Sequence, residues 1–445
     1  MRAACRPTAL AAPWVIALGA LSASQVQAAA FQLQEQSASL LGSAFAGRSA
    51  DAADVSHMFF NPASLAAQSG RGPEASVVLS RIDPTFDYAS DNPVAAESTL
   101  PGSRTSAAGG ERATVPVAYG AVDLAPDVRA GLGINVPYGL ETDYPDDWVG
   151  RYDAVHTEVL TVDINPAVAW QYNEEWAVGA GISAQYAEAV LSTMLPNDPT
   201  EGPWGLGERA PAPETDAKVE VEGDDWSYGF NVGARYEPDA DTRVGVAYRH
   251  GMGHTLTGDA TLSHDGQELD STGGEADLDL PATVHLGLSR DVHPDWTLLL
   301  DASWTQWSDF EELRIEFDED IGLGPAQEDE YDWDDTWFLS LGTRFDASEQ
   351  WDLRAGIAYD ETPVTREHRT PRIPDSDRTW LALGATWQPQ ALERLTVDVG
   401  YTYIWLDDAD ITLAKDLPDQ LQVDEVDGEY ESSVQVLTTG ASWRF

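Results

Sequence analysis

The chain has a single cysteine, few basic side chains and no long hydrophobic run. The cysteine, Cys5, lies in an N-terminal stretch of the secretory type, so we expect a mature chain without thiols or disulfides. Acidic side chains outnumber basic ones by 76 to 25, for a formal net charge of −51. Nucleic acids bind through basic groups that neutralise phosphates, so they are excluded as partners. No run of about 18 apolar residues follows the N-terminal stretch, which excludes membrane-spanning helices.

Residues 1–28 have the order of a signal peptide. Arg2 and Arg6 precede the apolar run ALAAPWVIALGALSA, and small residues follow it, so we expect cleavage after Ala28. The alternative is an N-terminal membrane anchor, for which the run is shorter than the roughly 20 residues that a spanning helix needs.

The aromatic residues argue against disorder and mark the ends of alternating segments. In WSYGFNVGARY, Trp226, Phe230 and Tyr236 share one face, whereas Ser227 and Arg235 take the other. A period of two indicates a strand. Rings at both ends of its apolar face are typical of a strand that crosses a bilayer with one ring in each interface.

Such strands recur along the chain and are joined alternately by short turns and long loops. This predicts an all-β protein, a 14-stranded antiparallel transmembrane β-barrel over residues 73–445 in the outer membrane of a Gram-negative bacterium. The last strand then turns Leu437, Trp443 and Phe445 to lipid and Val434 and Val436 inward. A soluble sandwich or propeller is the alternative, but it leaves the loop alternation unexplained. The expected strands are 74–88, 113–124, 127–138, 155–172, 175–191, 217–237, 241–258, 277–291, 295–317, 331–346, 350–361, 378–388, 394–408 and 430–445.

The acidic residues crowd the predicted long loops, as in EFDEDIGLGPAQEDEYDWDD. There they would face water, calcium and lipopolysaccharide. Their spread over many loops favours plain solvation, which suits a saline habitat, over a funnel for cations or ligands. His250 and His254 share strand parity but have no third ligand nearby, so we expect no metal site and no cofactor. No G-x-S-x-G elbow is present, which disfavours a barrel-anchored hydrolase and any other enzyme.

Residues 29–72 break the period of two. They read AAFQLQEQSASLLGSAFAGRSADAADVSHMFFNPASLAAQSGRG, and their large apolar side chains are costly to leave in water. The segment is therefore either a periplasmic linker or a plug in the lumen. It resembles the N-terminal hatch of the long-chain fatty acid transporter family of the bacterial outer membrane (the FadL/OmpP1/TodX group). VPYGLETDYPDDWVGRYDA and RIPDSDRTWL extend the resemblance over nearly the whole mature chain.

The resemblance implies a monomeric barrel that is plugged by the hatch at 29–72 and passes long-chain fatty acids or similar hydrophobic molecules passively. Ligand binds near the hatch N-terminus, where Phe31 matches, and leaves sideways into the membrane at a kink in the third strand. Neutral hydrocarbons or aromatics are an alternative cargo. A water-filled general porin is a further alternative, which would need a polar lumen and no hatch.

The third strand, VRAGLGINVPYGL, has the residues that a kink needs. Pro137 lacks a ladder N–H and Gly139 invites a bulge. By resemblance, Asn61 and Pro62 of the hatch lie against this kink near Gly139, where the Asn61 amide could bond freed backbone groups. The alternative makes Pro137 a strand end and Asn61 a helix or turn cap.

One departure from the family concerns the ligand head group. Members that bind fatty acid carboxylates use basic side chains near the ends of strands five and ten, where this chain has Thr193 and Asp329. A carboxylate loses attraction at these ligand-binding positions. Either a nearby arginine cluster supplies the charge, or that cluster only braces its own loop, which we favour. The cluster comprises Arg366, Arg369, Arg372 and Arg378.

Overall fold

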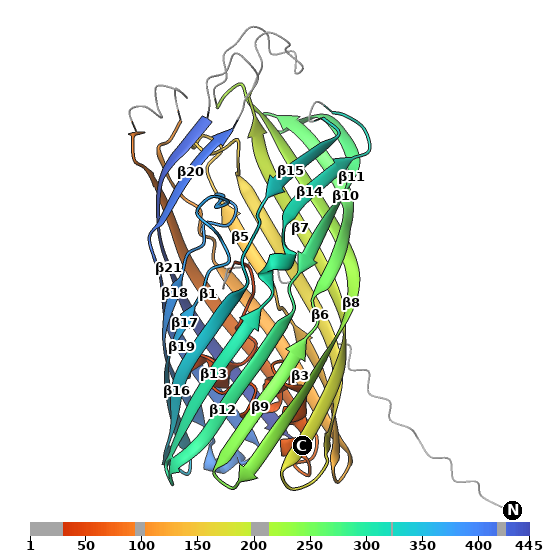
Figure 1. The fold of residues 1–445 in the computed structure, drawn as a ribbon, viewed down its shortest axis with the longest axis vertical. Coiled ribbons are helices and arrows are strands. Elements are labelled where there is room, and N and C mark those ends of the chain that lie inside the picture. The colour runs from red at the N-terminus through yellow and green to blue at the C-terminus, as the bar shows by residue number, and fades with distance from the viewer. Residues whose placement is uncertain (1–29, 94–102, 197–212, 322–323, 416–423) are drawn as a thin grey trace, which may run out of the picture.

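The computed structural model describes residues 30–93, 103–196, 213–321, 324–415 and 424–445. Over these residues the chain forms one closed antiparallel sheet (Figure 1). The barrel closes because β1 (Glu74–Ser90) pairs with β21 (Asp424–Arg444) along its whole length. The expected signal peptide at 1–28 lies outside the described residues, and its cleavage stays a prediction.

Fourteen strands cross the barrel within the described part of the chain, which confirms the predicted fold class. Six of them consist of two consecutive segments, because the strand is interrupted. In order around the barrel they are β1; β3 (Ala113–Ala125); β4 (Val128–Asn135) with β5 (Gly139–Asp143); β6 (His156–Gln171); β7 (Trp176–Leu195); β8 (Ala217–Asp239); β9 (Thr242–Arg249) with β10 (Met252–His264); β11 (Gln267–Leu280) with β12 (Thr283–His293); β13 (Trp296–Thr305) with β14 (Glu312–Phe317); β15 (Ala326–Glu330) with β16 (Thr336–Ser348); β17 (Trp351–Asp360); β18 (Arg378–Trp387); β19 (Leu395–Leu406) with β20 (Ala409–Lys415); and β21. The short β2 (Ser106–Ala108) extends the sheet beside β1.

The two faces of each strand differ as the alternation predicts. On β21, Leu437 is 46% exposed on the outer face, whereas Val434 and Val436 are buried on the inner face. Rings gather at both ends of the outer face: Trp176 stacks on Tyr236 with centroids 4.4 Å apart, and other pairs stand at the opposite end. The apolar outer face is the one that lipid covers.

Strands seven and eight extend further than the sequence analysis predicted. Residues 259–276 were expected to form a long loop between two strands, yet β10 continues to His264 and β11 begins at Gln267. Leu256, Ala260 and Leu262 keep the inward parity while charged residues point outward. Asp265 and Gly266 form the hairpin turn, both with positive φ. Asp-Gly is a strong hairpin signal, which the sequence analysis did not use.

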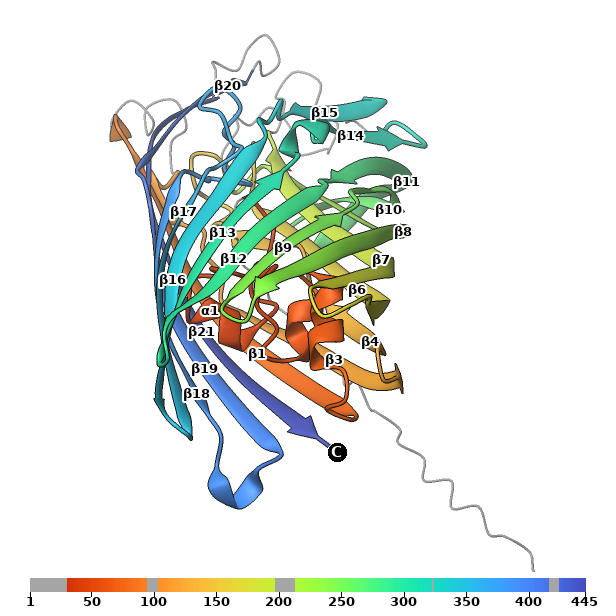
Figure 2. The same cartoon turned by 60° about the horizontal axis from the view of Figure 1, so that its bottom comes forward.

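The hatch fills the lumen rather than hanging below the barrel, as Figure 2 shows for the red and orange segment. Its short helical elements are α1 (Ala38–Leu41) and the 3₁₀ turns η1 (Val55–Met58) and η2 (Pro62–Gln68); two further turns, η3 (Trp307–Asp309) and η4 (Gln390–Leu392), belong to the barrel. Buried ion pairs and hydrogen bonds attach it to the wall, such as Arg48 to Asp301 at 3.0 Å. No described helix is long and apolar enough to cross a membrane.

Candidate functional site

A small apolar cavity lies beside the hatch N-terminus. We call it the Phe31 cavity; its lining includes Phe31, Val159, Leu256, Leu278 and Phe310. Its volume is about 60 Å³, far below the roughly 300–1,000 Å³ of typical ligand pockets. A chain-like ligand must therefore displace side chains in order to bind. Phe31 is 1% exposed and lines this cavity, and its contact with ligand stays a prediction.

Aromatic rings surround Phe31. Its centroid lies 5.0 Å from that of Trp307 and 5.7 Å from that of Phe310, both edge-to-face. Tyr138 and Trp333 complete the cluster at 5.9 Å each. Each such ring pair contributes about 0.5–1.5 kcal/mol beyond area burial.

The sequence analysis missed this cluster because it treated 295–317 as one strand. In the structure the strand breaks between Thr305 and Glu312, and η3 turns Trp307 and Phe310 inward. Trp307 and Phe310 are three residues apart, which does not fit the strand period of two. This spacing was the signal that could have predicted the break in the strand.

The hatch N-terminus is hydrogen-bonded to the wall at the kink in strand three. Leu33 N donates to Pro137 O at 2.8 Å, and Gly139 N donates to Phe31 O at 2.8 Å. The Gln36 side chain completes this contact by donating to Val136 O at 2.6 Å and accepting from Val136 N at 3.3 Å. The hatch thus replaces the ladder partner that the kink has lost.

The missing partner is β3. Its ladder with strand three ends at Ala118 beside Ile134, and the next bridge above joins Gly110 to Thr142. Residues 113–117 of β3 pair with β1 alone. We call this interruption the wall opening. Pro116 of β3 and Pro137 of strand three lie on the two sides of the wall opening, and neither has a backbone N–H to donate across it.

Asn61 and Pro62 do not lie against the kink, which corrects the expectation from the family resemblance. Asn61 Nδ2 donates to Ser49 O at 2.7 Å and to Ala234 O of β8 at 3.1 Å. Its Oδ1 accepts from Ala63 N at 2.9 Å, so Asn61 caps η2 and Pro62 occupies the first turn. The cap alternative is the right one. Asn-Pro is a common start for a helical turn, and that local preference determined the position.

Thr193 and Asp329 line one cavity although they are far apart in sequence. This Thr193 cavity measures about 110 Å³ and adjoins the Phe31 cavity, with which it shares Leu191, Ile315 and Arg372. Thr193 Oγ1 donates to Arg151 O at 3.1 Å. Asp329 lies 3.6 Å from Arg372 Nε. Their contact with ligand stays a prediction.

The arginine cluster divides into two roles. Arg366 pairs with Asp410 at 3.0 Å, Arg369 donates to Asp375 O at 3.0 Å, and Arg378 is paired with Asp375 and Asp360. Burial of the Arg369 guanidinium lowers its pKa. These three side chains brace segment 361–377, as the sequence analysis favoured. Arg372 differs, because it lines both cavities.

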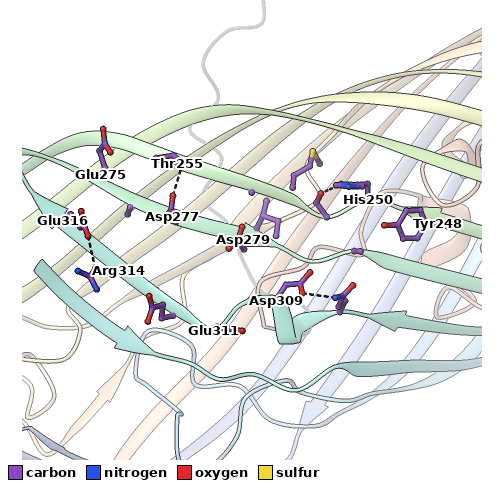
Figure 3. A pocket seen from close by; sticks show the side chains of 18 residues that line it. Tyr248, His250, Thr255, Glu275, Asp277, Asp279, Asp309, Glu311, Arg314 and Glu316 are labelled. Atoms are coloured by element: carbon purple, nitrogen blue, oxygen red, sulfur yellow. Dashed lines mark hydrogen bonds and ion pairs between the residues drawn. The ribbon is translucent and has the colours of Figure 1, made fainter.

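An acidic cleft lies on the outer wall, where β11 and β14 part (Figure 3). Its volume is about 700 Å³, and Asp277, Asp279 and Asp309 are among its carboxylates. His250 lies at its edge, whereas His254 is buried and contacts Gln185 at 3.1 Å. The described residues contain no group of three or more side chains suited to hold a metal ion.

A closed barrel with a lipid-facing apolar surface and a plugged lumen defines an outer-membrane transport protein. The sequence model of one family, described as "Outer membrane protein transport protein (OMPP1/FadL/TodX)", matches residues 19–445. The chain belongs to this family, whose members are transporters rather than enzymes.

Relatives and solved structures agree with this assignment. The long-chain fatty acid transport protein of Escherichia coli O6:H1 is 30% identical, over 86% of this chain and 89% of its own. The 47 kDa outer membrane protein of Pasteurella multocida is 29% identical, with the same coverage of both chains. The crystal structure of a Pseudomonas aeruginosa FadL homologue superposes with a TM-score of 0.82 at 26% identity, over 94% of this chain and 100% of that one. The Pseudomonas putida toluene transporter TodX shares the fold, with a TM-score of 0.68 at 16% identity over 92% and 98% of the two chains.

Proposed function

We propose that this protein, acting as a monomer, carries long-chain fatty acids or similar hydrophobic molecules passively across the outer membrane. The ligand binds in the Phe31 cavity, the hatch N-terminus moves, and the ligand leaves through the wall opening. The relatives that are named long-chain fatty acid transport proteins support this cargo.

The observation that carries the proposal is the double role of the hatch N-terminus. The Phe31 ring lines the cavity, while its carbonyl accepts from Gly139 N beside the wall opening. A ligand too large for the present cavity must move Phe31. That movement strains the hydrogen bonds that hold Leu33 and Phe31 to the kink. Binding and opening are thereby coupled through Phe31 and Leu33 of the hatch.

The outer surface below the wall opening suits a lateral exit. A groove of about 530 Å³ lies there, between β3 and β4, and its lining includes Val122, Leu132, Ile134 and Phe445. These apolar residues face lipid, so a hydrophobic molecule that leaves the barrel here stays out of water.

A reversible cross-link tests the coupling. Gln32 and Tyr138 form an antiparallel bridge between hatch and kink. Such pairs have Cα atoms about 4.5–5.5 Å apart, which suits a disulfide. Outside 1–28 the sequence has no cysteine, so Gln32→Cys with Tyr138→Cys creates one defined pair. We expect uptake of a fluorescent fatty acid to stop when the pair is oxidised and to return with reductant. Each single variant is the control. Equal uptake by the oxidised and reduced forms contradicts the proposed movement.

The second candidate cargo is a neutral hydrocarbon. The mostly apolar lining of the Phe31 cavity favours it as much as a fatty acid chain. A fatty acid and a neutral hydrocarbon differ at the head group, and Arg372 is the residue that distinguishes them.

A further inference from the structure

We infer that Arg372 binds the carboxylate of the ligand, which makes the preferred cargo a long-chain fatty acid rather than a neutral hydrocarbon. This inference rests on the proposed function. It assigns to a residue of segment 361–377 the positive charge that Thr193 and Asp329 do not provide.

Arg372 is placed between the two cavities. It is 7% exposed and belongs to the lining of both the Phe31 cavity and the Thr193 cavity. Its neighbour Ile373 lines the Phe31 cavity but not the Thr193 cavity. A molecule whose chain fills the Phe31 cavity, against Leu256 and Leu278, therefore has its polar end beside the guanidinium.

Among the described residues, Arg372 is the sole cation in the lining of either cavity. An ionised carboxylate is costly to take from water unless a positive partner and hydrogen-bond donors receive it. A buried guanidinium supplies both, because its planar N–H groups match the two oxygens of a carboxylate. A hydrocarbon without a polar end has no use for such a group in a cavity whose lining is mostly apolar.

The guanidinium has spare bonding capacity in the present structure. Its Nη1 makes two long contacts, 3.3 Å to Thr157 Oγ1 and 3.5 Å to Ser192 O. Its Nε is 3.6 Å from Asp329, whose side chain is 43% exposed. Nη2 makes no hydrogen bond to a described residue. By contrast, Arg378 has an ion pair with the fully buried Asp375. Arg372 can thus exchange the weak Asp329 contact for a ligand carboxylate.

The test compares binding of oleate and of methyl oleate to the full-length protein in neutral detergent. These probes share the chain and differ in charge. Removing a charged hydrogen-bond partner costs about 10- to 100-fold in affinity. We therefore expect Arg372→Gln to weaken oleate binding by that factor and to leave methyl oleate unchanged. Arg372→Lys should restore part of the oleate affinity, since it restores charge without the planar fork.

Arg366→Gln is the matched control, because it removes an arginine of the same segment whose side chain is 72% exposed and paired with Asp410. It should leave both affinities unchanged. Undiminished oleate binding by Arg372→Gln overturns the inference, and so does an equal loss of both probes, which indicates a collapsed cavity. If the natural protein binds neither probe, the proposed function itself fails. If it binds both and Arg372→Gln changes neither affinity, only the head-group assignment fails.

Discussion

The backbone N–H of Ala30 donates a hydrogen bond to Asp375 Oδ2 at 2.9 Å, which ties the start of the hatch to segment 361–377. The other carboxylate oxygen accepts from Arg378, and Thr362 also donates to Oδ2. Arg372, three residues earlier, lines the Phe31 cavity. The buried carboxylate of Asp375 therefore connects segment 361–377, which lines the Phe31 cavity, with the hatch N-terminus, which is hydrogen-bonded to the kink.

Asp375→Ala should release the hatch N-terminus. A hydrogen bond to a charged group contributes about 1.5–3 kcal/mol, so amide exchange over residues 30–36 should accelerate about tenfold or more. Hydrogen-exchange mass spectrometry measures this directly. Glu367→Ala, an exposed change in the same segment, is the control. Unchanged protection of 30–36 in Asp375→Ala contradicts the coupling.

Gln36→Leu should loosen the wall opening. The leucine keeps the volume but leaves Val136 N and O without their side-chain partners, at a cost of about 1–3 kcal/mol. We expect a lower unfolding midpoint together with a faster release of bound fatty acid into lipid vesicles.

Gln68→Leu is the matched control for Gln36→Leu. Gln68 Nε2 donates to Asp54 O at 2.7 Å within the hatch, away from the kink. This variant should lose comparable stability without altering release. Identical release by both variants argues that Gln36 has no special role at the kink.

Asn61→Ala should affect stability and not transport. Its amide caps η2 and contacts β8, so the loss is that of a cap, about 1 kcal/mol, together with two carbonyl contacts. At a temperature where the variant is folded, its fatty acid uptake should equal that of the natural protein. A selective loss of uptake would restore Asn61 to a gating role.

The sequence was most informative where a pattern repeats. Strand number, the direction of Leu437 and Val436, and the barrel class all follow from a period of two, which needs no knowledge of distant partners. The contact of Gln36 with Val136 joins positions 100 residues apart in an aperiodic segment, and no local rule predicts it. Asn61 shows the same limit. The sequence indicates that Asn61 can cap a helical turn, but it does not indicate that Asn61 contacts Ala234 of β8.

Two features of the barrel and its site were not predicted. Strands seven and eight were predicted too short, because the Asp265–Gly266 turn was not recognised as the hairpin that joins them. Asp329 stands where the family resemblance implies a basic side chain, and the structure sets Arg372 beside it. Which of two opposite charges faces a cavity depends on the closed barrel, which brings strand ten next to segment 361–377.

Asp329→Asn should act in the opposite direction to Arg372→Gln. It removes the anion that competes for the guanidinium, and a partly exposed pair of this kind is worth up to about 1 kcal/mol. Oleate affinity should therefore rise about two- to fivefold at low salt, with less gain at high salt because ions screen the pair. Methyl oleate binding should stay constant. Weaker oleate binding in this variant means that Asp329 orients Arg372 rather than competing with the ligand.

Gly245→Ala should unseat the hatch. A Cβ at Gly245 of β9 would overlap the carbonyl oxygen of Ser49, and Ser49 Oγ also donates to Gly245 O at 3.1 Å. Overpacking at so close an approach costs about 1–3 kcal/mol, which the hatch avoids by shifting away from the wall. We expect larger single-channel conductance in planar bilayers, because water replaces hatch side chains in the lumen. Gly120→Ala is the control, since its Cβ would lie 3.8 Å from the nearest heavy atom, Glu74 O. If Gly245→Ala inserts as a barrel and conducts no more than Gly120→Ala, then the seal does not depend on this contact.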